Sequence, residues 1–243
     1  EELELDLSPF AALRGNVEFS AARFVRPVFY LAKTDAGVKP PSLPLGSRIA
    51  LSVMKARAML ATNPGRPNFA DLPADAFGSV EIVDGAIAAG SSDSHQDLAT
   101  DISGTIELPA LNLPARIVLH GKINAEPISL DIHAGQPLLL LAGGLSQISA
   151  SIDSGFLSAS FDGAFQVDEV IDGKTNLAVR SLREALSWID NGLGRNVADT
   201  PVSLTTRLSG SPRQLNLDQV DMKVGASEAI GALDLAVAGG MPS

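Results

Sequence analysis

Hydrophobic and polar residues alternate with a period of two along much of the chain. In residues 115–124 the odd positions are apolar or Gly, and the even positions are mostly polar. The same alternation recurs in residues 102–108, 128–133, 202–209 and 233–237. This pattern indicates β-strands that have one apolar and one polar face. We therefore predict a sheet with one long apolar side.

The apolar positions of these strands are the candidate lining of a binding surface. They are Ile102, Ile106, Leu108, Ile117, Leu119, Ile123, Ile128, Leu130, Ile132, Val202, Leu204, Leu233, Leu235 and Val237. Because a large aliphatic side chain left in water forgoes about 1.5–3 kcal/mol, this side needs a cover. A second sheet, as in an ordinary β-sandwich, the helices, or a hydrocarbon ligand could supply it. The aliphatic lining suits acyl chains better than sugars or nucleotides.

Turn signals separate the predicted strands. Asp84-Gly85, Asp162-Gly163 and Asp172-Gly173 are dipeptides typical of hairpins. The segment 124–127 joins two alternating strands so closely that we predict a hairpin, which would place His120 near Asp131. Since most gaps between strands are too short for a crossover helix, the sheet should be mostly antiparallel.

Two segments have helical signals. Residues 47–63 begin with Ser47 as a candidate N-cap and stop before a proline. Residues 181–193 begin with a capping box formed by Ser181 and Glu184.

We predict a mainly β fold in which one long, curved, mostly antiparallel sheet forms an open apolar groove, with two α-helices. The chain then reads as a single domain. Its parts are N-terminal strands (1–46), a helix (47–63), a linker (64–77), strands (78–180), a second helix (181–193) and C-terminal strands (194–243).

Amino-acid composition and net charge exclude several kinds of functional site and partner. The 243 residues include no Cys, which excludes a thiol nucleophile, a disulfide framework and a zinc–thiolate site. The net charge of −10 argues against nucleic acid as a partner. Residues 1–66 carry nine Lys/Arg and six Asp/Glu, whereas residues 67–243 carry nine and 22. The basic start indicates either proximity to anionic lipid headgroups or a chance clustering of surface charge.

The sequence has neither a membrane span nor a signal peptide. Its longest apolar run, residues 138–142, is far below the roughly 20 residues that a spanning helix needs. The chain opens in the middle of an alternating pattern, at residues 1–7. We therefore expect it to be a piece of a longer protein.

Catalytic signals are weak. Ser146 lacks the second glycine of a nucleophile elbow, and Asp93, His95 and Asp97 do not fit the spacing of a calcium loop. We interpret His120 and His133 as polar-face strand residues. Spacing leaves paired carboxylates for glycoside hydrolysis open, but one Trp and one Tyr provide few sugar-stacking rings. We expect no catalytic residue, no metal, no cofactor and no enzymatic activity.

A series of short motifs follows a familiar order along most of the chain. They are LSPFAALRGNVEF at 7–19, RFVRPVFYL at 23–31, DAG at 35–37, NP at 63–64, LPADAFGSVEIVDG at 72–85, PLLLLAGG at 137–144, SFDG at 160–163, SLREALSW at 181–188 and GALDL at 231–235. In this order the chain resembles the AsmA family of bacterial envelope proteins, which are related to bridge-like lipid-transfer proteins with a repeating β-groove. Two departures are the missing N-terminal transmembrane helix and the end at Pro242-Ser243, where members usually continue.

The resemblance implies a periplasmic protein that is anchored to the inner membrane in its full-length form. It implies binding of phospholipid or another acyl lipid in the groove, for envelope lipid transport or outer-membrane homeostasis. The family has no catalytic residues to transfer. The alternative is a structural or assembly scaffold of the envelope without lipid cargo, which pairs with other proteins by strand addition at an open edge.

Overall fold

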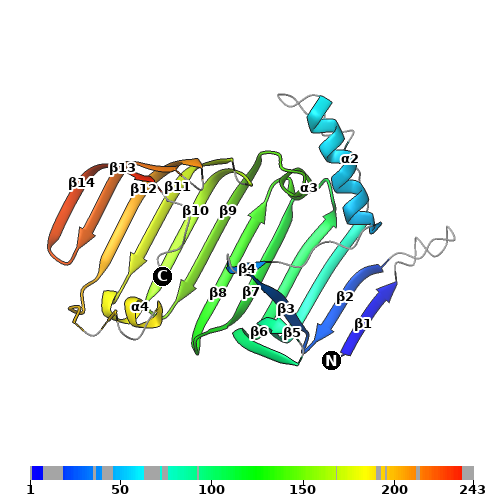
Figure 1. Ribbon diagram of the computed structural model, residues 1–243, viewed down its shortest axis with the longest axis horizontal. Coiled ribbons are helices and arrows are strands. Elements are labelled where there is room, and N and C mark those ends of the chain that lie inside the picture. The colour runs from blue at the N-terminus through cyan, green and yellow to red at the C-terminus, as the bar shows by residue number, and fades with distance from the viewer. Residues whose placement is uncertain are drawn as a thin grey trace.

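The computed structural model shows one large, open, curved β-sheet, and the described residues include three helices at its margins (Figure 1). It describes residues 2–7, 19–34, 37–39, 46–62, 72, 76–91, 93–167, 169–189, 193–194, 196–211 and 214–236. The prediction of a mainly β chain with a long, curved, mostly antiparallel sheet is confirmed.

The strands are β1 (Glu2–Leu7), β2 (Phe19–Val25), β3 (Val28–Thr34), β4 (Gly37–Lys39), β5 (Ala76–Ser91), β6 (Ser94–Ala110), β7 (Ala115–Ile123), β8 (Glu126–Ala134), β9 (Ser146–Ser154), β10 (Leu157–Gln166), β11 (Val170–Val179), β12 (Val202–Ser211), β13 (Gln214–Val224) and β14 (Ser227–Ala236). From β5 to β14 each strand pairs antiparallel with the next one along the chain. At the other end, β2 and β3 both pair with β5 in parallel, and β1 pairs with β2. The simple up-and-down order explains why short connections suffice for most of the sheet.

The two predicted helices are present, with shorter bounds. Helix α2 (Arg48–Thr62) begins after Ser47, whose Oγ accepts the backbone N–H of Ala50 at 3.2 Å. Helix α4 (Leu182–Ile189) begins after Ser181, whose Oγ accepts the N–H of Glu184 at 3.1 Å. Both hydroxyls satisfy donors that the first turn leaves free.

A third helix, α3 (Pro137–Leu141), was not predicted. It lies within the segment 78–180 that the sequence assigned to strands alone. Its five residues are too few to show a helical period, although Pro137 occupies the first turn, where a missing N–H costs nothing. In addition, β5 begins at Ala76, inside the predicted linker 64–77.

The three Asp-Gly pairs are not hairpin turns, which corrects the prediction. Asp162-Gly163 lies within β10 and Asp172-Gly173 within β11, where the two glycines face each other. A Cβ on Gly173 would lie 2.7 Å from the ring of Phe161, so the glycine makes room for an aromatic side chain. The predicted hairpin at 124–127 is confirmed, with φ values of +50° and +67° at Asn124 and Ala125 that match a type I′ turn.

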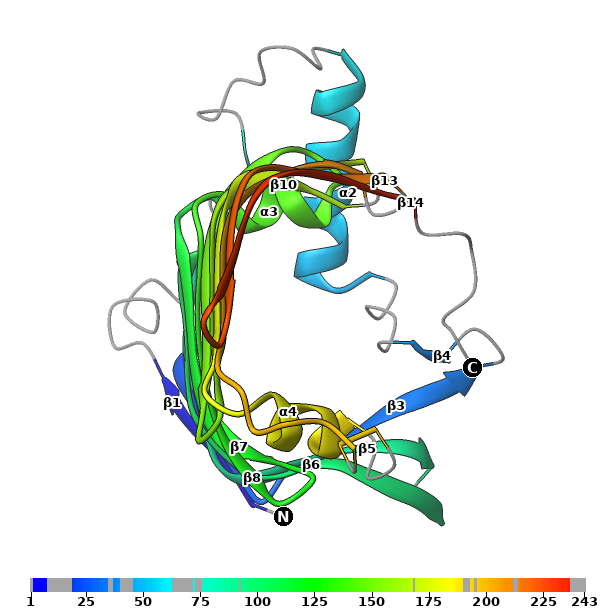
Figure 2. The ribbon, with the colours of Figure 1, turned by 90° about the vertical axis from the view of Figure 1, so that its left-hand side faces the viewer.

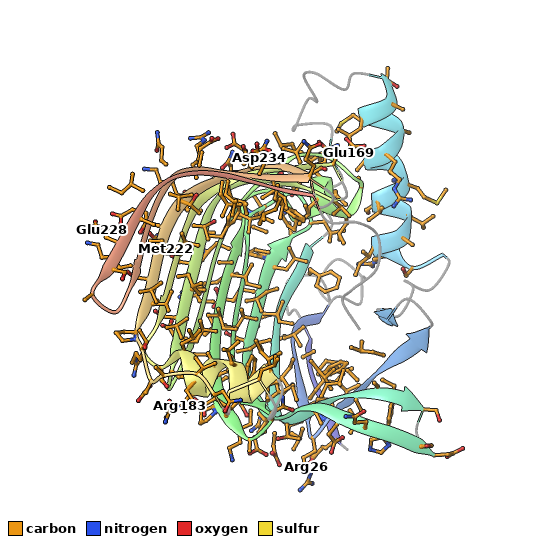
Figure 3. All side chains as sticks on the ribbon, turned by 60° about the vertical axis from the view of Figure 1, so that its left-hand side comes forward. Arg26, Glu169, Arg183, Met222, Glu228 and Asp234 are labelled. Carbon is orange, nitrogen blue, oxygen red and sulfur yellow. The ribbon has the colours of Figure 1, made fainter. Side chains whose placement is uncertain are left out.

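Asp84-Gly85 instead forms part of a corner in the sheet. Arg26, Asp84 and Asp101 each have φ of +54°, and the register of β5 and of β6 shifts beside the two aspartates. Bulges of this kind bend a strand and increase its twist. Beyond the corner, β3 and the far ends of β5 and β6 turn toward the inside of the curve (Figure 2). Arg26 marks the corner in Figure 3.

The buried core lies at one end of the molecule, not in the middle of the sheet. It consists of Val53, Ala56, Leu72, Leu111, Leu138, Leu139 and Ala142. These residues join α2 and α3 to the β6–β7 connection, and the half-buried Leu108 of β6 packs against them. Because α2 and α3 lie on the inside of the curve, this contact assigns the Leu108 side of the sheet to the concave face (Figure 2).

Candidate functional site

The concave face carries an unbroken row of apolar residues across ten consecutive strands. In register from β5 to β14, the row is Ile82, Gly104, Leu119, Leu130, Ile152, Ala159, Leu177, Leu204, Met222 and Ala229. It shares the face of Leu108, since residues 104 and 108 are four apart on β6. We call these ten residues the inner row. At about 4.8 Å per strand, its nine intervals span about 43 Å.

A second row runs beside it on the same face. From β5 to β12 it contains Val80, Ile106, Ile117, Ile132, Ala150, Phe161, Thr175 and Thr206. Its only polar members are the two threonines on β11 and β12. The Thr206 hydroxyl is buried and donates to the carbonyl of Asp218 at 2.9 Å. The apolar surface is therefore broad as well as long.

The convex face one residue away is polar. Its matching row from β5 to β14 is Glu81, Thr105, Val118, Asp131, Ser151, Ser160, Asn176, Thr205, Asp221 and Ile230. In Figure 3, Glu228 and Asp234 of β14 lie on this outer side. The contrast between the two rows is the separation of faces that the period-two pattern predicts.

Protein atoms do not seal the inner row. Ile82 is 5% exposed, but Leu119, Leu130, Ile152, Leu177 and Leu204 are only half-buried. Side chains on adjacent strands cover the two sides of each inner-row side chain. Its outer end is buried only if a second layer of protein packs over the sheet. Among the described residues, the main strand–strand contacts all join ladder neighbours, so no second sheet packs across the face. The β-sandwich alternative is therefore wrong for this part of the chain.

The fold places the predicted lining residues along this face. Leu119, Leu130 and Leu204 belong to the inner row, and Ile106, Ile117 and Ile132 to the row beside it. Ile102 and Ile128 are buried near the corner, at 6% and 8% exposure. Leu108 packs against the core cluster. Val202 of β12 pairs with Val224 of β13. Leu233 and Leu235 on β14 are exposed. Ile123 ends β7. Val237 lies outside the described residues.

Sequence reasoning missed lining residues that β9, β10, β11 and β13 contribute. Ile148 and Ile152 of β9, Phe161 of β10, Leu177 of β11 and Met222 of β13 were not selected. The signal was present in residues 148–152, where Ile, Ala and Ile alternate with Ser. Because Ala and Gly fill many inward positions there, the apolar face is less obvious than in β7 or β8.

A cavity of about 850 Å³ lies beside α4, between the β7–β8 and β9–β10 turns. Phe156 and Trp188 form its aromatic wall, with ring centroids 5.7 Å apart. Trp188 is fixed by its indole N–H, which donates to the carbonyl of Ile123 at 2.8 Å. Glu126 and Glu184 add carboxylates to the lining. This cavity therefore combines an apolar wall with a polar border at one margin of the sheet.

Ion pairs are on the convex face. The Arg116 guanidinium contacts the Asp131 carboxylate at 2.9 Å, and this hydrogen bond lowers the pKa of Asp131 and raises that of Arg116. Hydrogen bonds from Arg23 to Glu4 and from Lys122 to Asp101 raise the pKa values of the two cations. All these groups are solvent-accessible, so screening limits what each pair contributes to stability.

His120 and Asp131 lie on the same face of the hairpin, as predicted, but as diagonal neighbours and not as a directly opposed pair. His120 pairs with Ser129, and its Nδ1 lies 3.0 Å from the Ser129 Oγ. Asp131 pairs across the ladder with Val118, and its carboxylate also lies 3.4 Å from His133. The β7–β8 turn was predicted correctly. Its two-residue type I′ loop pairs Asp131 with Val118, so placing His120 directly opposite Asp131 would need a register shifted by two residues.

The other residues considered for catalysis or metal binding form hydrogen bonds or ion pairs within the protein. Ser146 is buried, and its Oγ accepts the N–H of Gln136 at 2.9 Å and donates to the carbonyl of Gln147. His95 and Asp97 form an exposed pair at 3.6 Å, and the ring of Tyr30 stacks edge-on against His95. Within the described parts of the chain, no group of three or more His, Asp or Glu residues has the geometry to hold a metal ion.

No helix within the described residues is both long enough and apolar enough to cross a membrane. A scan against protein-family models, a search of curated proteins and a search of solved structures each gave no match to this chain.

Proposed function

We propose that this protein binds acyl lipids without catalysis, with the hydrocarbon lying along the inner row of the concave face. The observation that carries the proposal is a broad apolar surface that spans ten strands and over which, among the described residues, no second sheet packs. Monomeric soluble proteins rarely expose an apolar patch larger than a few hundred Å² unless something binds there.

The chemistry of the face favours hydrocarbon over other ligands. The inner row has no charged group and no hydrogen-bonding side chain, so it offers nothing to orient a sugar or a nucleotide. An acyl chain needs only contact, and each methylene removed from water contributes about 0.8 kcal/mol. The row is also long enough, because one leaflet of a bilayer has a hydrocarbon thickness of about 15 Å.

The polar margin of the face provides a place for a headgroup. The cavity beside α4 has Phe156 and Trp188 on its apolar wall and Glu126 and Glu184 at its border. In this proposal the headgroup remains at such a rim in contact with water, and the tails lie against the sheet. The envelope setting, with an inner-membrane anchor outside this chain and a role in phospholipid transport or outer-membrane homeostasis, rests on the motif resemblance.

An envelope scaffold without lipid cargo is the second candidate. One observation favours it: β14 ends the sheet, with Ile230 80% exposed and Leu233 52% exposed. An open edge of this kind offers unpaired backbone groups to a strand from another protein. A scaffold would use the edge of the sheet and leave its concave face without a ligand.

Two measurements on protein purified without detergent test the lipid proposal. We expect native mass spectrometry to show bound phospholipid. We also expect a dansyl-labelled phospholipid to accept energy from Trp188, the only Trp in the chain. Because Trp188 lies next to the concave face, transfer should occur on binding there. Absence of bound lipid together with no uptake of the labelled lipid would contradict the proposal and favour the scaffold.

A further inference from the structure

Helix α2 has a second apolar stripe on the side that faces away from the protein. At 3.6 residues per turn, Val53 and Ala56 lie on the side packed against the core. Leu51, Met54 and Ala58 lie on the opposite side and are exposed, with Leu51 at 48% and Met54 at 63% exposure. The helix is therefore apolar on two sides, and only one of them has a partner in the described structure.

Cations border the outward stripe on both sides. Arg48 and Lys55, seven residues apart, align along one border, and Arg57 lies along the other. The Arg57 guanidinium donates to the carbonyl of Leu141 at 3.4 Å. For Arg48 and Lys55, the described part of the chain shows no hydrogen bond or ion pair, so their charges are available to a partner.

The surrounding sequence strengthens the charge contrast. Residues 36–70 contain five Lys/Arg and no Asp or Glu, in a chain with a net charge of −10. An anionic surface would therefore repel most of the molecule and attract this region. Figures 1 and 2 show the C-terminal half of α2 projecting beyond the ends of the strands, whereas its N-terminal half lies on the inside of the curve.

We propose that α2 docks this protein on an anionic lipid bilayer, with Leu51 and Met54 entering the interface and the flanking cations contacting headgroups. An exposed apolar stripe bordered by Lys and Arg is the arrangement of helices that lie in the plane of a membrane interface. The cationic border complements an anionic bilayer, and the test below distinguishes this occupant from a second copy of the chain. The inference concerns a different surface from the concave face and does not depend on lipid binding there.

Flotation of the full chain with vesicles tests the proposal. We expect the protein to float with vesicles of equal phosphatidylglycerol and phosphatidylcholine at low salt, and not with pure phosphatidylcholine. Salt at 0.5 M should release it, because the Debye length then falls to about 4–5 Å. The double variant R48Q/K55Q should lower the partition coefficient about 25-fold, at about fivefold per cation. The variant L51S/M54S should lower it at least about tenfold.

Control variants make similar changes on other surfaces of the protein. K174Q/K223Q removes two exposed cations from the sheet, and I230S removes an exposed apolar side chain, so both should bind as the unaltered protein does. The proposal is overturned if the unaltered protein does not float, if it floats equally with neutral vesicles, or if R48Q/K55Q leaves flotation unchanged. A concentration-dependent dimer that L51S/M54S abolishes, without vesicle binding, would assign the stripe to a second copy instead.

Discussion

Replacing Leu119 with Asn is expected to weaken acyl-lipid binding about 30-fold. Leu119 lies in the middle of the inner row between Gly104 and Leu130, so one of its flanks has no neighbouring side chain. The change removes contact with two or three lipid methylenes, at about 0.8 kcal/mol each, or about 2 kcal/mol in total. Titration of the variant with a fluorescent phospholipid measures the loss.

The adjacent residue provides the control. Val118 lies on the same strand and is also half-buried, but it faces the convex side opposite Asp131. The variant Val118→Asn should bind lipid as the unaltered protein does, and circular dichroism should show that both variants keep their strands. Equal losses in the two variants would mean that the effect comes from strand stability and not from the concave face.

The substitution Leu138→Ala is expected to give the largest loss of stability. Leu138 is fully buried in the cluster that joins α2 and α3 to the sheet. Removing a buried leucine side chain and leaving a cavity costs about 2–5 kcal/mol. Because this cluster is the main connection of α2 to the rest of the molecule, the loss should appear first as increased hydrogen exchange in residues 48–62.

Leu141 in the same short helix is the matched control for that experiment. Its side chain is 49% exposed, so Leu141→Ala should change the free energy of unfolding by less than about 0.5 kcal/mol. Denaturant unfolding of the two variants measures the difference. Similar midpoints for both would show that the cluster around Leu138 does not hold the helices in place.

The period-two pattern was sufficient to predict the class of fold and the two faces of the sheet. Alternation in β7 and β8 marks the inward positions because their large aliphatic residues face polar ones. The cap residues Ser47 and Ser181 likewise predict where α2 and α4 begin. These are local signals, and the structure satisfies them with local hydrogen bonds.

The sequence did not predict features that depend on neighbouring strands. The backbone conformations that an Asp-Gly pair favours occur in hairpin turns and in β-bulges alike. Asp84 lies at a corner of the sheet because β5 pairs with β2, β3 and β6 around it. Position 173 requires glycine because a Cβ there would lie 2.7 Å from the ring of Phe161 on the adjacent strand. The length of the inner row is a property of ten registers together, so no single segment reveals it.

The most direct test of acyl binding on the concave face is site-specific photocrosslinking. A benzophenone amino acid is placed at position 119 or at position 118, the protein is exposed to phospholipid and irradiated, and the intact mass is measured. We predict a lipid adduct at position 119 and none at position 118. Adducts at both positions, or at position 118 alone, would contradict the assignment of the lipid to the inner row.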